Sequence, residues 1–221
     1  MPRTDQDRHY EYYPAFLDLV RKRVVVVGGG TIATQKVRGL LPCGADPIVV
    51  IAPKVSALIQ EQAGQGRLRW EQRPYQPGDL EGADLVFAST NDRSLNAEVA
   101  REAREREIRV LAVDDIPYCD FIAPAVVKRG QLTVAISTSG RSPALASHTR
   151  RKLERVVTPE WGKLLEVAAS VRDRLGPYRA KIAPEQWQEA LDREVKRLVW
   201  AGDTEQATDL LWSRLAPEEL R

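Results

Sequence analysis

Three short stretches of this 221-residue chain combine residue types that can bind a ligand or react with it. A glycine-rich turn begins at Gly28, and bare backbone of this kind can receive phosphate groups. A carboxylate that can accept a proton stands at Asp114. A loop from Ser137 to Pro143 offers hydroxyls, N–H groups and a guanidinium to an anion. Together these features predict a site for a phosphate-bearing ligand and a second, carboxylate-rich ligand.

The glycine turn lies between two segments of clear pattern. Val24 to Val27 is an apolar β-branched run that is typical of a strand buried on both faces. Gly28 allows a sharp turn, Gly30 lets a pyrophosphate approach the backbone, and Ala33 takes the third glycine position where helix meets strand. The helix that follows would direct its first N–H groups at the phosphates. The stretch predicts a dinucleotide-binding unit, and the alternative is a structural turn in another α/β protein.

Two further strand ends belong to the same predicted site. Pro47 to Pro53 forms a second strand, and it ends without the Asp or Glu that holds the ribose hydroxyls in a typical NAD site. Lys54 either favours a 2′-phosphate or faces solvent. Another strand, Leu85 to Ser89, ends in Thr90 and Asn91, at the edge where open parallel sheets bind ligands.

Asp114 follows the fifth predicted strand, Ile108 to Val113, and is expected beside a nicotinamide. It is either a general base or metal-facing carboxylate at the mouth of the site, or a capping residue in a turn. The hydroxyl-rich loop has two interpretations as well. It is a capped helix start, with Ser142 before Pro143, or a binding site for carboxylates. The candidate substrate-binding residues are Ser137, Thr138, Ser139, Arg141 and Ser142.

The elements that must position these residues alternate between strand and helix five times. This alternation predicts an α/β fold with a Rossmann-type, doubly wound parallel sheet over residues 1–113. Residues 114–143 contain a hairpin, Ala125 to Thr138, that has too few partners within one chain, so we expect a homodimer paired there. Residues 144–221 form a helical C-terminal domain, in which tryptophans at helical spacing are expected in the core.

The composition narrows the function class. A net charge of +2 argues against a general nucleic-acid binder, and no segment approaches the ~20 apolar residues of a membrane span. The two cysteines, Cys43 and Cys119, are far apart and indicate reduced thiols rather than a disulfide framework. The N-terminus has no apolar stretch of the signal-peptide type. We therefore expect a cytoplasmic protein.

Several stretches together resemble the precorrin-2 dehydrogenase family, the amino-terminal module of sirohaem synthase. They occur in the family's order over about residues 12–157 and include YPAFLDL, VVVVGGGTIATQK, PIVVIAP, ASTNDRSLN, VDD, DFIAPAVVKRG and LTVAISTSGRSP. The late loop departs from the S-[ST]-G-G of many members, since it reads Ser137-Thr138-Ser139-Gly140 here.

The resemblance implies NAD-dependent oxidation of precorrin-2 to sirohydrochlorin. In some members the same site also inserts ferrous iron, with no permanent metal. The family's aspartate falls on Asp114, which would contact iron only transiently. Its nucleotide-contacting pairs fall on Thr31 and Ile32 and on Pro53 and Lys54. Two competing hypotheses are a nucleotide-sensing Rossmann module, which needs no general base, and a protein that carries a tetrapyrrole.

Overall fold

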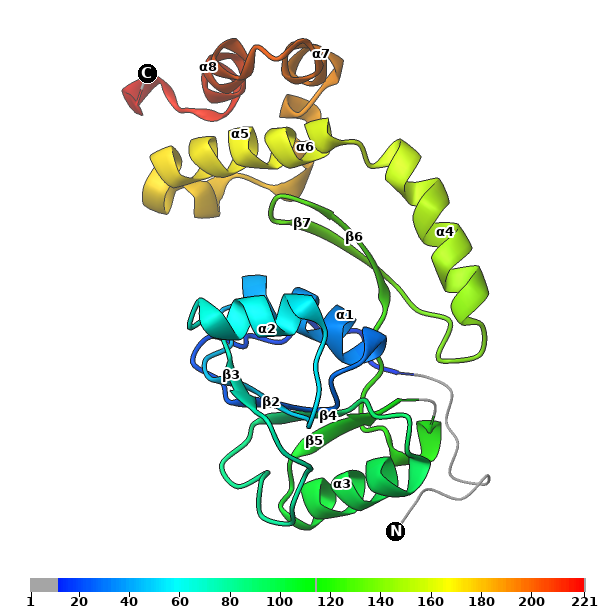
Figure 1. The fold of residues 1–221 in the computed structure, drawn as a ribbon. Helices are drawn as coiled ribbons and strands as arrows, with labels where there is room; N and C mark the ends of the chain where they lie inside the picture. Colours follow the sequence, from blue (N-terminus) through cyan, green and yellow to red (C-terminus); the bar gives the residue numbers. More distant parts are fainter. Residues whose placement is uncertain (1–11, 114, 221) are drawn as a thin grey trace. The chain divides into compact units, whose positions relative to one another are not determined.

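The computed structural model describes residues 12–113 and 115–220, and its contacts divide the chain into two compact units, Met1–Ala123 and Pro124–Arg221 (Figure 1). Each unit has its own hydrophobic core. The sequence-based division at residues 113 and 143 stays a prediction. Within the described residues, no helix is both long enough and apolar enough to cross a membrane.

The first unit is built on a five-stranded parallel sheet with the strand order β3-β2-β1-β4-β5. The strands are β1 (Val24–Val27), β2 (Ile48–Ile51), β3 (Arg69–Glu71), β4 (Leu85–Ala88) and β5 (Arg109–Ala112). β1, β2 and β4 are buried along their whole length, as continuous apolar runs predict for a sheet covered on both faces. The chain reverses its direction of winding between β1 and β4. The predicted Rossmann-type fold is confirmed, and its switch point lies at these two strands.

Helices cover both faces of this sheet. α1 (Thr31–Leu40) and α2 (Ala57–Gly64) lie on one face and α3 (Arg93–Glu105) on the other (Figure 1). Short 3-10 turns follow α1 and β5, at Leu41–Cys43 (η2) and Ile116–Tyr118 (η3). Because every helix begins at the carboxyl end of the preceding strand, the loops at that edge gather the predicted nucleotide residues.

The second unit joins a hairpin to a group of helices. β6 (Ala125–Arg129) and β7 (Leu132–Ile136) pair antiparallel, and α4 (Pro143–Val156) packs mainly on β6. The helical core is formed by α5 (Pro159–Leu175), α6 (Pro184–Ala190), α7 (Arg193–Ala201) and α8 (Thr204–Leu215), with 3-10 turns at Gly176–Lys181 (η4) and Glu218–Leu220 (η5). The predicted hairpin and helical tail are therefore both present.

Two details of the tail differ from the sequence-based expectation. The apolar residues from Trp187 to Leu198, which have one helical spacing in the sequence, lie on two helices because Asp192 caps a new one. Its carboxylate accepts hydrogen bonds from the backbone N–H groups of Glu194 and Val195. The expectation that the tryptophans are core residues is wrong for Trp161 and Trp200. These two rings stack edge to face at the surface, 37% and 42% exposed.

Candidate functional site

The first two glycines of the turn are required by the fold itself. Gly28 has a φ of 120°, and a Cβ there would lie 2.4 Å from the carbonyl oxygen of Ser89. A Cβ on Gly29 would lie 2.0 Å from the carbonyl oxygen of Lys54. The turn is therefore wedged between the ends of β4 and β2. No side chain fits at either position without moving backbone.

Gly30 has a different reason for being glycine. Its backbone is extended, with φ −80° and ψ −164°, and a Cβ built on it meets nothing within 4 Å. It stands at the N-cap of α1, where no side chain caps the helix. The first N–H groups of a helix have no partner within the helix, and they attract anions. Open space beside uncapped N–H groups fits a dinucleotide pyrophosphate.

The neighbouring residues of α1 agree with that fit. Thr31 is exposed, Ile32 is half-buried, and Ala33 is fully buried where helix meets sheet. The Thr34 hydroxyl donates to the carbonyl oxygen of Gly30 at 2.8 Å and lies 2.7 Å from the Ser56 hydroxyl. Ser56 in turn donates its N–H to the carbonyl oxygen of Gly29 at 3.0 Å. These two hydroxyl residues brace the turn, and the sequence analysis missed them.

At the end of β2, Pro53 and Lys54 are both exposed. The Trp70 indole N–H donates to the carbonyl oxygen of Ala52 at 2.9 Å, and this bond fixes the backbone directly before Pro53. Lys54 makes no ion pair with any residue between 12 and 113 or between 115 and 220. Both readings of Lys54, a 2′-phosphate contact and a solvent-facing residue, fit this geometry.

The end of β4 is organised around a residue that the sequence analysis did not single out. Asn96 is 3% exposed, and its side chain bonds Thr90 through the N–H, the hydroxyl and the carbonyl oxygen, at 3.1, 2.8 and 3.0 Å. The Thr90 hydroxyl is therefore engaged inward, while Asn91 is exposed. The sequence did contain a signal for this role, because Asn96 is a polar residue on the buried stripe of α3. That stripe consists of Asn96, Val99, Ala100 and Ala103.

The predicted Asp114 lies outside the residues that the structure describes, so its role stays a prediction. The groups around the end of β5 are half-buried or buried. Burial raises the pKa of the Cys119 thiol to about 11, and its Sγ lies 3.0 Å from the carbonyl oxygen of Ala112. Burial also lowers the pKa of Lys36, whose ammonium lies 5.8 Å from the centroid of the Phe87 ring. Low dielectric surroundings of this kind strengthen charge interactions.

The hydroxyl-rich loop belongs to the second unit, and its groups bond mainly to one another. The Thr138 hydroxyl donates to the carbonyl oxygen of Ser142 at 3.0 Å and accepts the Ser142 N–H at 3.2 Å. The Ser137 hydroxyl accepts the N–H of Ser139, which has a φ of 53°. The Ser142 hydroxyl caps α4, as predicted, by accepting the Leu145 N–H. The loop is a hydrogen-bonded helix start, in which Ser139 is half-buried and Arg141 is exposed.

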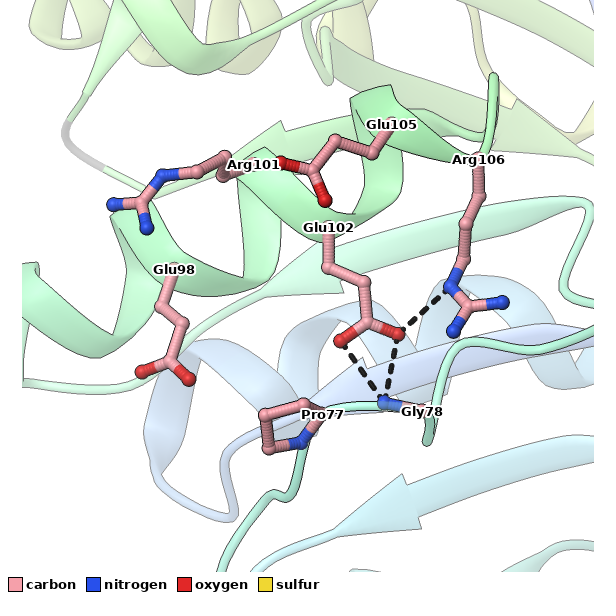
Figure 2. Close-up of a pocket in the computed structure, with 7 residues that line it drawn as sticks. All are labelled: Pro77, Gly78, Glu98, Arg101, Glu102, Glu105 and Arg106. Atoms are coloured by element: carbon pink, nitrogen blue, oxygen red, sulfur yellow. Dashed lines mark hydrogen bonds and ion pairs between the residues drawn. The ribbon is translucent and has the colours of Figure 1, made fainter.

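One hollow in the first unit, of about 370 Å³, lies apart from these residues, along α3 (Figure 2). Glu102 forms its base. Its carboxylate accepts the Gly78 N–H at 3.0 Å, the Arg106 guanidinium at 2.9 Å and the Tyr75 hydroxyl. Because its bonds hold the 75–82 loop against the helix, we assign Glu102 to the fold rather than to the site.

Family models match both halves of the chain. A model described as "Putative NAD(P)-binding" matches residues 15–125, and one described as "Sirohaem biosynthesis protein central" matches residues 129–155. The first includes the glycine turn and the ends of β2 and β4. The second includes the hydroxyl-rich loop and most of α4.

Similar proteins include the siroheme synthase of Photorhabdus laumondii, 35% identical over 213 residues, and siroheme synthase 1 of Cronobacter sakazakii, 39% identical over 214 residues. These alignments cover 96% and 94% of this chain. The chain spans only 45% of the length of either relative.

A solved structure of SirC, a precorrin-2 dehydrogenase, superposes with a TM-score of 0.73 at 28% identity and covers 91% of this chain and 100% of that one. These similarities confirm the resemblance seen in the sequence. The "Putative NAD(P)-binding" model matches half of the residues of this chain, and the chain therefore belongs to that NAD(P)-binding family.

Proposed function

We propose that this chain catalyses the NAD-dependent oxidation of precorrin-2 to sirohydrochlorin. The observation that carries the proposal is the open space at Gly30 beside the uncapped start of α1. Similarity to SirC over the whole of that protein supports the choice of substrate. In this reaction precorrin-2 loses a hydride and a proton, so its balance requires one hydride acceptor and one proton acceptor.

NAD, when bound, supplies the hydride acceptor, and this chain's residues supply binding and orientation. The N–H groups at Thr31 and Ile32 would hold the pyrophosphate. Pro53 and Lys54 would border the ribose of the adenosine half, and Asn91 would face the cofactor from the end of β4. We propose NAD as the working cofactor, and in that case the exposed Lys54 faces solvent rather than a 2′-phosphate.

Asp114 is the proton acceptor in this proposal, since it comes two positions after the last residue of β5, Ala112, and ligands of open parallel sheets bind at the carboxyl ends of the strands. For the substrate we propose contacts from the hydroxyl-rich loop. Arg141 is exposed there, and Ser139 lies beside it. Precorrin-2 carries many carboxylates, so a guanidinium and hydroxyls suit its periphery. Ser137, Thr138 and Ser142 would support this loop through their mutual hydrogen bonds.

Three finer statements complete the proposal. Ferrous iron would be a second substrate in any chelation step, with Asp114 as a transient ligand. The chain would act as a homodimer, because β6 and β7 form a sheet of only two strands among the described residues. It would work in the cytoplasm, where free thiols such as exposed Cys43 persist.

The alternative is a Rossmann module that reports nucleotide levels. Spectral titration with precorrin-2, with and without NAD, separates the hypotheses. A dehydrogenase converts precorrin-2 to sirohydrochlorin only when NAD is present. A sensor binds NAD and leaves the tetrapyrrole spectrum unchanged, whereas a carrier perturbs that spectrum equally with and without NAD and forms no sirohydrochlorin. Either of the last two results would overturn the proposal.

A further inference from the structure

The three side-chain hydrogen bonds that Asn96 makes within the described residues all go to one residue, Thr90. Its Oδ1 accepts both the N–H and the hydroxyl of Thr90, and its Nδ2 donates to the carbonyl oxygen of the same residue. The Asn96 side chain thus binds both backbone groups of Thr90, as a neighbouring strand would. Since Asn96 is 3% exposed, water does not compete for these bonds.

Asn96 holds the Ser89–Thr90 backbone, and the glycine turn packs directly against this backbone. A Cβ on Gly28 would lie 2.4 Å from the carbonyl oxygen of Ser89 and 3.1 Å from the N atom of Thr90. The Ser89 N–H also donates to the carbonyl oxygen of Val27 at 2.8 Å. A shift of the Ser89–Thr90 peptide would therefore move the start of the glycine turn.

Neither flanking element needs Asn96 for its own formation. The start of α3 is capped by Asp92, whose carboxylate accepts the N–H groups of Ser94 and Leu95 at 2.8 and 3.2 Å. β4 is held along its length by β1 and β5. The hydrogen bonds of Asn96 therefore fix only the conformation of Thr90, which lies just beyond the end of β4.

We propose that Asn96 is the positioning residue of the nucleotide site, fixing the Ser89–Thr90 peptide so that the Gly28 turn and Asn91 present themselves to the cofactor. This inference rests on the proposed function. It also divides the work at the strand end: Thr90 is a structural link whose hydroxyl faces inward, and exposed Asn91 makes the contact with the nucleotide.

The test compares NAD binding by three variants of the full chain, measured by calorimetric titration. Asn96→Leu removes all three bonds, and we expect NAD affinity to fall about tenfold, because the Ser89–Thr90 peptide is then no longer held in the position that the cofactor requires. Asn96→Asp keeps the two acceptor bonds and loses the donor, so its affinity should lie between the wild type and Asn96→Leu. Gln62→Met is the matched control. Gln62 is also buried and hydrogen-bonded, to Gln65 and Arg67, but lies in the last turn of α2.

A positioning role and a general structural role give different kinetics. For a positioning role, the KM for NAD rises in both Asn96 variants, while the rate at saturating NAD and the KM for precorrin-2 stay near their wild-type values. Gln62→Met should lose thermal stability and keep its NAD affinity. Unchanged NAD affinity in Asn96→Asp, or an equal loss in Gln62→Met, overturns the inference; if Asn96→Leu does not fold, Asn96→Asp decides alone. A wild-type chain that binds no NAD would instead overturn the proposed function.

Discussion

Gly29 and Gly30 are adjacent glycines with opposite sensitivities to a side chain. A Cβ on Gly29 would lie 2.0 Å from the backbone oxygen of Lys54, whereas one on Gly30 enters open space. We expect Gly29→Ala to lower the free energy of unfolding by about 2 kcal/mol or more. Gly30→Ala should change it by less than about 1 kcal/mol while weakening NAD binding. Urea unfolding and NAD titration of both variants measure this contrast. Equal stability losses in the two variants would contradict it.

Asp114 is the residue whose chemistry the sequence predicts most sharply. Asp114→Asn keeps the size of the side chain and removes its ability to accept a proton. General-base contributions are about a hundred- to ten-thousand-fold, so the rate of precorrin-2 oxidation should fall by that range. NAD affinity should stay unchanged. If chelation uses the same carboxylate, iron insertion should fall too.

The control for Asp114 is its neighbour. Asp115 uses its backbone in the turn after β5, donating its N–H to Ala112 and accepting the Tyr118 N–H at 3.0 Å. Asp115→Asn should therefore affect the rate much less. A large loss in Asp115→Asn beside full activity in Asp114→Asn would show that the base was assigned to the wrong aspartate. Full activity in both would remove carboxylate catalysis from the mechanism.

The two cysteines should differ in reactivity. Cys119 is 4% exposed and its pKa is raised by burial to about 11, while Cys43 is exposed. A thiol reagent at pH 9 should label one cysteine in the folded chain, and Cys43→Ser should abolish that labelling. Because the thiol of Cys119 ionises more easily in the unfolded chain, its contribution to stability should be lost as pH rises from 9 to 11. Rapid labelling of Cys119 in the native chain would contradict this assignment.

At the scale of elements, the strands were predictable because their pattern is simple. Val24 to Val27 reads as a doubly buried strand, and its burial is complete. Helix boundaries depend on caps. The carboxylates of Asp92 and Asp192 cap α3 and α7, and the cap at Asp192 separates α7 from α6. Local side-chain hydrogen bonds determine where these helices begin, and the spacing of apolar residues carries no information about such bonds.

The candidate site also has a part that the sequence predicts and a part that it does not. The glycine turn and the strand ends could be predicted from the spacing of residues along the chain. The bracing contacts do not, because Thr34 meets Ser56 across 22 residues and their pairing depends on how α1 and α2 begin. Asn96 was hidden for a related reason: a buried Asn on a helix stripe indicates a partner but does not identify it.

The hairpin supports a prediction about assembly. β6 and β7 form a sheet of two strands among the described residues, and Val126 on β6 is 41% exposed. We expect the chain to be a dimer at micromolar concentration, because two strands alone are marginal in water. Val126→Glu should shift it toward the monomer in sedimentation experiments. Trp200→Glu, at an equally exposed site on α7, should leave the dimer intact; a wild-type monomer would contradict the prediction.

At the scale of the whole molecule, the proposal assigns a separate ligand to each unit. The nucleotide residues lie in the first unit, and the hydroxyl-rich loop lies in the second. The sequence allowed three hypotheses: a Rossmann sensor, a tetrapyrrole carrier and an enzyme that uses both ligands. The sensor gives no role to the hydroxyl-rich loop, and the carrier gives none to the glycine turn.

The most direct test of that hypothesis is NADH formation in an anaerobic mixture of the chain, NAD and precorrin-2. We expect one NADH for each sirohydrochlorin formed by the wild-type chain. We expect almost none from Gly30→Val, because its side chain would occupy the space at the start of α1. Circular dichroism would check that the fold of this variant stays intact. Wild-type activity in a folded Gly30→Val, or no NADH from the wild-type chain, would contradict NAD-dependent oxidation at the glycine turn.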